Sequence, residues 1–337
     1  MTANGDHEPA RIEESSLHNN RGVARHMAGE IDDARREYLA ALSLDPSNAT
    51  ALNNLGFATA AEGRHREAIE LYRRAIELQP SCALARNNLG NALLALGRIE
   101  ESIDAYRTAL ALDPAHEVAW LNLAQALCAQ GDPVAARRPY ERYLDLRPGH
   151  IPALVGLSAV LVALGDLDGA EKNLSLVLSL DRRQPEAWTR LGLVRLARGE
   201  LEAAVDCCRR ALDLEPSLAV ARYNLAIARL AMGDVGVAEE ELRRVLEACP
   251  DFLEAAGNLA VVEMALGKWE EAVALLRPLL TEGAGNPTLH FNLGLSLKEL
   301  GRIDEARLEL EKAIERWQPE SEWTARAHAV LDSLAGP

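Results

Sequence analysis

The chain has 337 residues, of which 48% are hydrophobic and only 4% aromatic, and its formal net charge is −15. This charge disfavours a large basic face, so binding to nucleic acid or to an anionic lipid surface is not expected. No run of about eighteen apolar residues occurs, so membrane insertion is not expected either. The five cysteines are odd in number and lack C-x-x-C spacing, which favours a reducing, cytoplasmic location over a disulfide scaffold.

Residues 1–14 form a polar N-terminal segment with several acidic side chains and no apolar core. The segment therefore does not resemble a secretory signal. Its composition predicts a disordered tail, and the regular part of the chain begins after it, at Ser15.

Residues 15–320 consist of units that repeat every 34 residues without insertions. Each unit carries a glycine after an apolar run, in the series Gly29, Gly63, Gly97, Gly131, Gly165, Gly199, Gly233, Gly267 and Gly301. Such a constant period is typical of a repeat array. The nine predicted units are 15–48, 49–82, 83–116, 117–150, 151–184, 185–218, 219–252, 253–286 and 287–320.

Each unit is predicted to contain two closely packed helices. The glycine of the series accepts the left-handed conformation that ends the first helix, and in most units a proline ends the second helix. Small residues recur seven positions before the glycine and five positions after it, which allows the two helices to approach closely. One such hairpin cannot bury its apolar face alone, so successive units are expected to stack into a solenoid.

After the ninth unit, residues 321–337 begin with an amphipathic stretch. It places Trp323, Ala327, Val330 and Leu331 on one face of a helix predicted over 321–334. We expect this helix to cap the last repeat, because it would cover apolar surface that the end of an array otherwise exposes.

These motifs resemble the tetratricopeptide repeat family. The segment 51–80, ALNNLGFATAAEGRHREAIELYRRAIELQP, carries the L-G, the alanine and the terminal proline of that pattern. The resemblance implies an all-α fold, a right-handed α-solenoid superhelix of nine helix-turn-helix repeats with a C-terminal capping helix. It also implies that the first helices line the concave surface. Because one fold serves many functions, the resemblance does not specify a partner.

An amide side chain recurs on the first helix of most units, two residues before a small residue. This asparagine ladder reads Asn20, Asn54, Asn88, Asn122, Gly156, Arg190, Asn224, Asn258 and Asn292, and the preceding position adds Asn19, Asn53 and Asn87. A primary amide has the donors and the acceptor needed to bind a peptide backbone unit. The superhelical repeats of O-GlcNAc transferase look similar, with NNLG and NLA in the same register, and there the ladder holds the main chain of the substrate. That resemblance implies the same role here for Asn54, Asn88, Asn122, Asn224, Asn258 and Asn292.

Two interpretations of the ladder remain open: its amides bind an extended peptide, or they form hydrogen bonds to a neighbouring helix. The doubled asparagines of three consecutive units favour peptide binding. On that interpretation, apolar and polar neighbours of the ladder also face the groove. The candidate peptide-binding residues are Asn20, Asn53, Asn54, Phe57, Asn87, Asn88, Asn91, Asn122, Arg190, Tyr223, Asn224, Asn258, Phe291 and Asn292.

The ladder is interrupted in the middle of the chain, at Gly156 and Arg190. We therefore expect two groove segments, 20–122 and 224–292, joined by a less regular centre. Arg190 is nearly the only basic residue on the ladder, so a clamp for a terminal carboxylate, which needs several cationic partners, is not expected.

Motifs for catalysis are absent from the sequence. The chain has no G-x-x-x-x-G-K-[ST] or G-x-S-x-G pattern, and its histidines show no metal-binding spacing. We therefore expect no enzyme activity, no cofactor and no metal site. The favoured hypothesis is a scaffold that binds a protein or an extended peptide. The alternatives are a substrate-targeting subunit of a separate enzyme, such as a glycosyltransferase, and a self-associating assembly factor, and the oligomeric state stays open.

Overall fold

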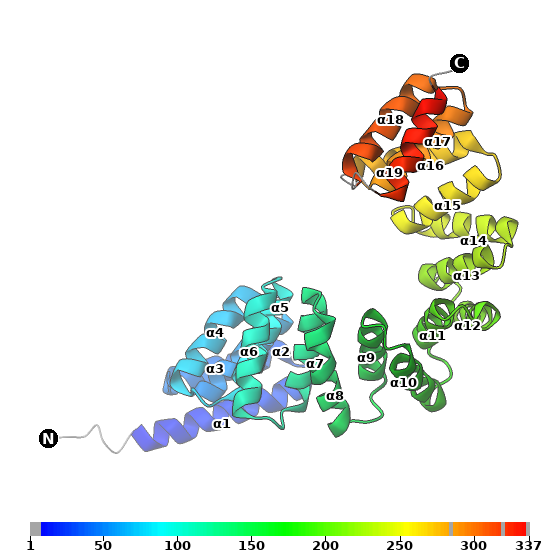
Figure 1. Ribbon diagram of the computed structural model, residues 1–337. Coiled ribbons are helices and arrows are strands. Elements are labelled where there is room, and N and C mark those ends of the chain that lie inside the picture. The colour runs from blue at the N-terminus through cyan, green and yellow to red at the C-terminus, as the bar shows by residue number, and fades with distance from the viewer. Residues whose placement is uncertain (1–7, 283–285, 318–320, 335–337) are drawn as a thin grey trace. The chain divides into compact units, whose positions relative to one another are not determined.

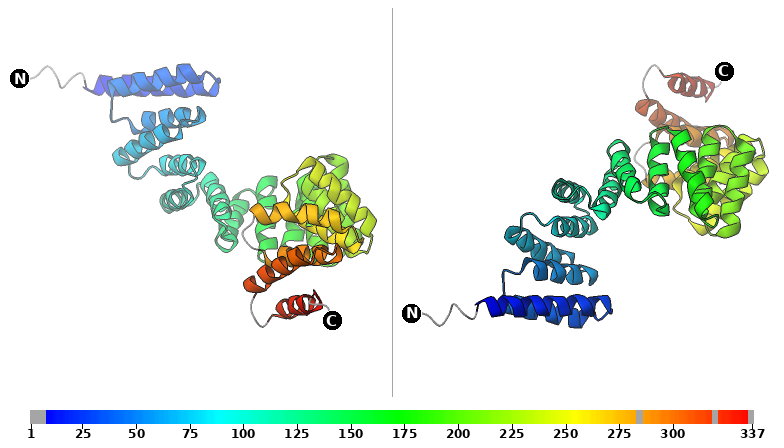
Figure 2. Two further views of the ribbon diagram at one scale, coloured as in Figure 1. Left: turned by 90° about the horizontal axis from the view of Figure 1, so that it is seen from above. Right: turned by 90° about the horizontal axis from the view of Figure 1, so that it is seen from below.

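The computed structural model describes residues 8–282, 286–317 and 321–334 of the chain. These residues form α-helices joined by short turns, and none of them lies in a β-strand. They divide into two compact units, Met1–Asn173 and Leu174–Pro337. Within each unit the helices follow one another as hairpins in chain order, as Figure 1 and the two views of Figure 2 show. The fold is an all-α helical repeat solenoid.

The first unit contains four complete hairpins and the first helix of a fifth. Its helices are α1 (Glu8–Met27), α2 (Ile31–Leu44), α3 (Ala49–Ala61), α4 (His65–Leu78), α5 (Ala83–Ala95), α6 (Ile99–Leu112), α7 (Glu117–Gln130), α8 (Pro133–Leu146) and α9 (Ile151–Ala163). Helix α10 (Leu167–Leu180) contains the boundary between the units. This boundary falls between the two interruptions of the asparagine ladder.

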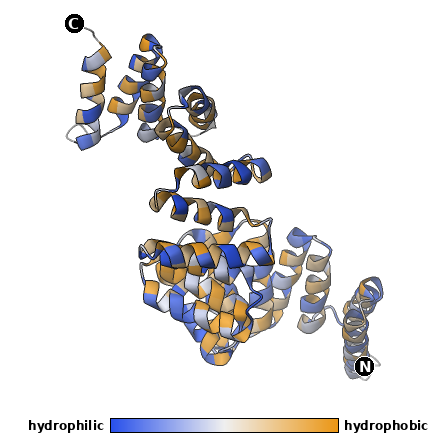
Figure 3. Cartoon of the chain, turned by 90° about the vertical axis from the view of Figure 1, so that its right-hand side faces the viewer, coloured by the Kyte–Doolittle hydropathy of each residue, from blue (hydrophilic) through white to orange (hydrophobic). Residues whose placement is uncertain are grey.

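The second unit contains four hairpins and a final single helix. Its helices are α11 (Pro185–Ala197), α12 (Leu201–Leu214), α13 (Ala219–Ala231), α14 (Val235–Ala248), α15 (Leu253–Ala265), α16 (Trp269–Glu282), α17 (Pro287–Glu299), α18 (Ile303–Arg316) and α19 (Glu322–Leu334). In both units, hydrophobic and hydrophilic residues share each helix, which is the pattern of helices that are buried on one side only (Figure 3).

The prediction that residues 1–14 are disordered is wrong for residues 8–14, which form the beginning of α1. Pro9 stands near the helix start, where its missing N–H has no intrahelical partner to lose. The helix is then held by Ser15, whose fully buried hydroxyl donates to the carbonyl of Ala41 at 2.9 Å and accepts from the amide of Asn48 at 2.9 Å. Residues 1–7 lie outside the described residues.

The glycines of the 34-residue series end the first helices, as predicted. All nine have positive φ, between +71° and +85°, which only glycine adopts without strain. In the third hairpin the backbone N–H of Gly97 donates to Leu94 at 2.9 Å, and that of Arg98 donates to Leu93 at 3.0 Å. These two bonds satisfy carbonyl groups that the end of a helix otherwise leaves without partners.

Small residues on the first helix make room for large residues on the second helix of the same hairpin. A Cβ atom placed on Gly90 would lie 2.5 Å from the ring of Tyr106, which is fully buried. The same relation joins Gly22 to Tyr38, and the seventh hairpin has Ala226 in the small position instead. In the first three hairpins a glycine therefore leaves the space that a buried tyrosine ring fills, as close packing requires.

The stacking of the hairpins places the first helices on the inner side of each unit. Contacts join α1 to α3, α3 to α5, α5 to α7 and α7 to α9 in the first unit, and α11 to α13 and α15 to α17 in the second. The described part of the chain shows no comparable contact between successive second helices. A stack whose first helices are closer together than its second helices curves toward the first helices, so these form the concave face.

Helix α19 lies where the capping helix was expected, packed against α17 and α18. Ala327 is fully buried in this contact. The rings of Phe291, Trp317 and Trp323 form a cluster with centroids 5.5 to 6.3 Å apart. Such offset aromatic contacts add to the burial of apolar area and fix the helix on the last repeat.

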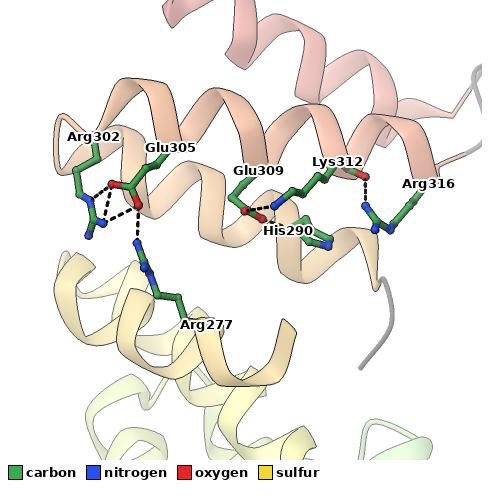
Figure 4. A network of polar contacts seen from close by, with 7 residues as sticks. All are labelled: Arg277, His290, Arg302, Glu305, Glu309, Lys312 and Arg316. Atoms are coloured by element: carbon green, nitrogen blue, oxygen red, sulfur yellow. Dashed lines mark hydrogen bonds and ion pairs between the residues drawn. The ribbon is translucent and has the colours of Figure 1, made fainter. Parts of the chain in front are cut away.

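A polar network joins the two helices of the ninth hairpin to each other and to α16 (Figure 4). The Glu309 carboxylate lies 2.6 Å from Nδ1 of His290 on α17 and 2.7 Å from Nζ of Lys312 on α18. Burial opposes ionisation of Glu309, but the bonds from Lys312 and His290 prevail and lower its pKa below the ordinary value. Nearby, Glu305 accepts from Arg277 of α16 at 2.6 Å, which joins the eighth hairpin to the ninth.

Candidate functional site: the asparagine ladder

The ladder lies on the first helices, which form the inner face. The residues four positions before and three positions after each ladder residue lie on the same side of the helix, so they share this face. Several of these neighbours are large, apolar and exposed. Before the ladder, Leu84, Val118 and Val220 are 50 to 52% exposed. After it, Phe57 and Val261 are 49% and 43% exposed. The inner faces of both units therefore combine amide groups with accessible apolar side chains.

In the first unit, the ladder amides are hydrogen-bonded to one another from hairpin to hairpin. Nδ2 of each of three ladder asparagines donates to Oδ1 of the asparagine 35 residues earlier, which lies in the preceding hairpin. The pairs are Asn54 to Asn19 at 2.9 Å, Asn88 to Asn53 at 3.0 Å, and Asn122 to Asn87 at 3.0 Å. The doubled asparagines are therefore an inter-repeat connection, and the interpretation of hydrogen bonding to a neighbouring helix holds for these pairs.

The burial of the doubled asparagines agrees with this role. Asn19, Asn53 and Asn87 are 3 to 6% exposed, and each also donates weakly to the asparagine that follows it, at 3.3 to 3.5 Å. A buried amide needs such partners, because an unsatisfied one costs about 1–3 kcal/mol. Asn53 and Asn87 were expected to bind peptide, and their burial leaves them no direct access to one.

Asn91 takes part in the same connection. Its Oδ1 accepts from Nδ2 of Asn122 at 2.9 Å and from the hydroxyl of Tyr106 at 2.7 Å. Both acceptor positions of this oxygen are thus used, while its NH₂ group stays available on an exposed residue.

The second unit uses the same 35-residue relation with different residues. Nδ2 of Asn258 donates to the hydroxyl of Tyr223 at 2.8 Å. Nδ2 of Asn224 is buried without a hydrogen-bond partner. The residue 35 positions before Asn224 is Thr189, whose hydroxyl donates to its own helix at Pro185, 2.9 Å away. Asn224 therefore lacks the bond that the ladder amides of the first unit make.

Asn292 is the last residue of the ladder and has no side-chain partner 35 positions earlier, because that residue is Gly257. Among the described residues its amide makes no hydrogen bond. It borders a hollow of about 530 Å³ that is also lined by Tyr223, Gly257 and Asn258. Sequence reasoning did not single out Gly257, although a glycine at this position breaks the series of larger residues in the other repeats.

The remaining predicted site residues lie in varied surroundings. Arg190 is bound to Glu186 on its own helix at 2.8 Å, which offsets its charge. The exposed ring of Phe57 lies 5.2 Å from that of His26, and the half-buried ring of Tyr223 lies 5.0 Å from that of Phe252. Asn20, the first residue of the ladder, is exposed.

Phe291 does not line the groove as expected. It is 5% exposed and packs in the aromatic cluster beneath α19. The same repeat position is also buried in earlier repeats, as at Asn53 and Asn87, and in the last repeat α19 takes the place of the following first helix that covers it.

The described residues contain no group of three or more His, Cys, Asp or Glu side chains placed to hold a metal ion. In the same part of the chain, each helix is too short or too polar to cross a membrane.

Comparison with solved structures shows the same fold in other proteins. The TPR protein YrrB, whose structure is described as having an unusual peptide-binding site, is 21% identical with a TM-score of 0.52, over 55% of this chain and 95% of that one. PilF of Pseudomonas aeruginosa is 20% identical with a TM-score of 0.56, over 63% and 97%. The APC/C heterotetramer Cut9–Hcn1 is 18% identical with a TM-score of 0.60, over 88% of this chain and 57% of that one.

Comparison with curated protein sequences gave no match. The sequence profile of the tetratricopeptide repeat matches residues 20–81, 59–117, 87–151 and 223–287, and related profiles of the same repeat match 127–192, 185–218 and 263–329. These matches cover well over half of the chain and agree with its hairpins and turn glycines. The chain belongs to the tetratricopeptide repeat family.

Proposed function

We propose that this protein is a non-enzymatic interaction scaffold that binds an extended peptide segment of a partner along the inner face of its first helices. The family supports binding of a protein or peptide. The inner face supplies amide groups for the peptide backbone and exposed apolar residues for its side chains.

Hydrogen bonds and burial together decide which ladder amides are available, since Asn88 and Asn224 are only 7% and 5% exposed. In the first unit, Asn54, Asn88 and Asn122 spend one donor each on the inter-repeat connection. In the second unit, Asn258 retains its Oδ1 and one N–H, and Asn292 retains its whole amide. The observation that carries the proposal is this pair of amides on adjacent hairpins beside a hollow, so the main contact is assigned to the second unit.

The spacing of these amides suits an extended chain. First helices of adjacent hairpins pack about 8–10 Å apart, and an extended peptide advances about 3.3 Å per residue. Asn258 and Asn292 can therefore bind backbone groups of residues about three apart. Backbone binding of this kind tolerates many side chains, while the apolar neighbours supply selectivity.

A display library of random twelve-residue peptides tests the proposal. Wild-type protein is expected to enrich peptides that it then binds in solution, as measured by fluorescence anisotropy. The double variant Asn258→Ala, Asn292→Ala is expected to lose at least about tenfold in affinity, since two backbone bonds disappear. Glu270→Ala, on the exposed first turn of α16, serves as the matched control and is expected to bind like the wild type.

Circular dichroism and thermal melting establish that both variants are folded. Failure of the wild type to enrich any peptide would contradict the proposal. Equal binding by the wild type and the double variant would remove these two amides from the site.

A further inference from the structure

Gly257 lies in the interior of α15, where glycine costs about 1 kcal/mol of helix stability relative to alanine. Most interior glycines of this chain have a packing reason. A Cβ atom on Gly294 would lie 2.8 Å from Leu310, whereas a Cβ atom on Gly257 would meet nothing closer than Leu289, at 4.0 Å. Packing within the chain therefore does not require a glycine at this position.

The missing side chain opens the hollow of about 530 Å³ on the inner face of the second unit. The other repeats have asparagine, leucine, valine, threonine, tyrosine or phenylalanine at the corresponding position. Apolar side chains line much of the hollow, among them Val261, which is 43% exposed, and Leu289. The amides of Asn258 and Asn292 lie at its border. The hollow is thus an apolar socket beside two backbone-binding groups.

The socket is also lined by a negatively charged side chain, that of Glu254. Glu254 is the one charged residue among the described residues that line it, and it forms no ion pair with another part of the described chain. Burial, and to a lesser extent the carboxylate of Glu254, raise the pKa of the neighbouring Tyr223 phenol. A cationic group on a ligand would complement this carboxylate, and the net charge of −15 favours the approach of a basic partner.

We propose that the Gly257 socket receives one bulky apolar side chain of the bound peptide, and that a lysine or arginine nearby on the same peptide pairs with Glu254. This inference rests on the proposed function and names the peptide class: an extended segment with an apolar residue within two or three positions of a basic one. Glu254 lies one helical turn before Asn258 and lines the same hollow as Gly257. The basic and the apolar side chain of the peptide would therefore bind close to each other.

Two substitutions of Gly257 separate socket filling from effects on folding. Gly257→Leu fills the socket, and Gly257→Ala adds only a Cβ atom and raises helix propensity. Because the nearest neighbour of that Cβ atom is 4.0 Å away, both variants are expected to fold, which circular dichroism and thermal melting check. Glu254→Gln removes the charge and preserves the size of the side chain.

The probe is the random twelve-residue library, selected in parallel on wild type and variants. Wild type is expected to enrich peptides with a bulky apolar residue close to lysine or arginine. Gly257→Leu is expected to bind the best such peptide at least about tenfold more weakly, since an apolar side chain loses its site. Gly257→Ala is expected to stay within about threefold of wild type, and Glu254→Gln is expected to lose the preference for basic residues.

The outcomes distinguish the two proposals. If the wild type enriches no peptide, the proposed function fails, and this inference fails with it. If the wild type enriches peptides whose binding Gly257→Leu leaves unchanged, or peptides without the apolar and basic pair, peptide binding stands and the socket is refuted.

Discussion

Asn88→Ala and Asn292→Ala change the same repeat position and are expected to have opposite effects on local stability. Asn88 is 7% exposed and donates to Asn53 at 3.0 Å, and its removal leaves the acceptor of a buried amide without that donor. The lost bond costs about 1–2 kcal/mol, and the gain in helix propensity returns about 0.5 kcal/mol. The net expectation is a loss of about 1 kcal/mol around α5.

For Asn292→Ala only the gain in helix propensity remains, because the amide of Asn292 makes no hydrogen bond among the described residues. Asn292→Ala is therefore expected to stabilise α17 by about 0.5 kcal/mol. A repeat array need not unfold in one step, so a single free energy of unfolding is a poor readout. Native-state hydrogen exchange with mass spectrometry reports the local opening free energy of α5 and α17 separately.

A double-mutant cycle of Asn53→Ala and Asn88→Ala isolates the bond between the two amides. The expected coupling free energy is about 1 kcal/mol. A coupling near zero, or equal effects of Asn88→Ala and Asn292→Ala, would refute the division of the ladder into bonded and free amides.

Three further changes test the packing and the electrostatics. Gly90→Ala is expected to destabilise the third hairpin by about 1–3 kcal/mol, because the new Cβ atom would lie 2.5 Å from the Tyr106 ring. Adding Tyr106→Leu should recover much of this loss in the native-state hydrogen exchange of α5 and α6. The folded-state pKa of Glu309 is lowered, so its contribution to stability is present above its ordinary pKa and lost as the pH falls through the lowered value. Urea midpoints measured from pH 7 to pH 3 should therefore fall less steeply in Glu309→Gln. Arg243→Met removes the 2.5 Å ion pair to the fully buried carboxylate of Glu263 and leaves it only the longer contact to Lys268 at 3.5 Å, so it is expected to cost about 1–3 kcal/mol in the local opening free energy of α15, measured by native-state hydrogen exchange.

The repeats, the turn glycines and the capping helix could be predicted because they depend on local and periodic features. A left-handed glycine after an apolar run ends a helix whatever surrounds it, and nine such glycines at a constant spacing leave little choice of architecture. The start of α1 was missed because a polar composition predicts disorder, whereas Ser15 joins this helix to the rest of the first hairpin.

The sequence by itself determined that the chain is a tetratricopeptide solenoid, since this follows from the 34-residue period, but it placed Asn53, Asn87 and Phe291 in the groove, where the structure buries them. Only the tertiary structure decided which of the ladder amides are free. That depends on the residue 35 positions earlier, which the stacking of the hairpins brings next to the ladder residue. Asn53 accepts a hydrogen bond from Asn88, whereas Gly257 has no side chain, so Asn292 keeps its amide free and the socket stays unfilled. Hydrogen bonds between neighbouring repeats have no local signature, because each half of the pair lies in a different helix.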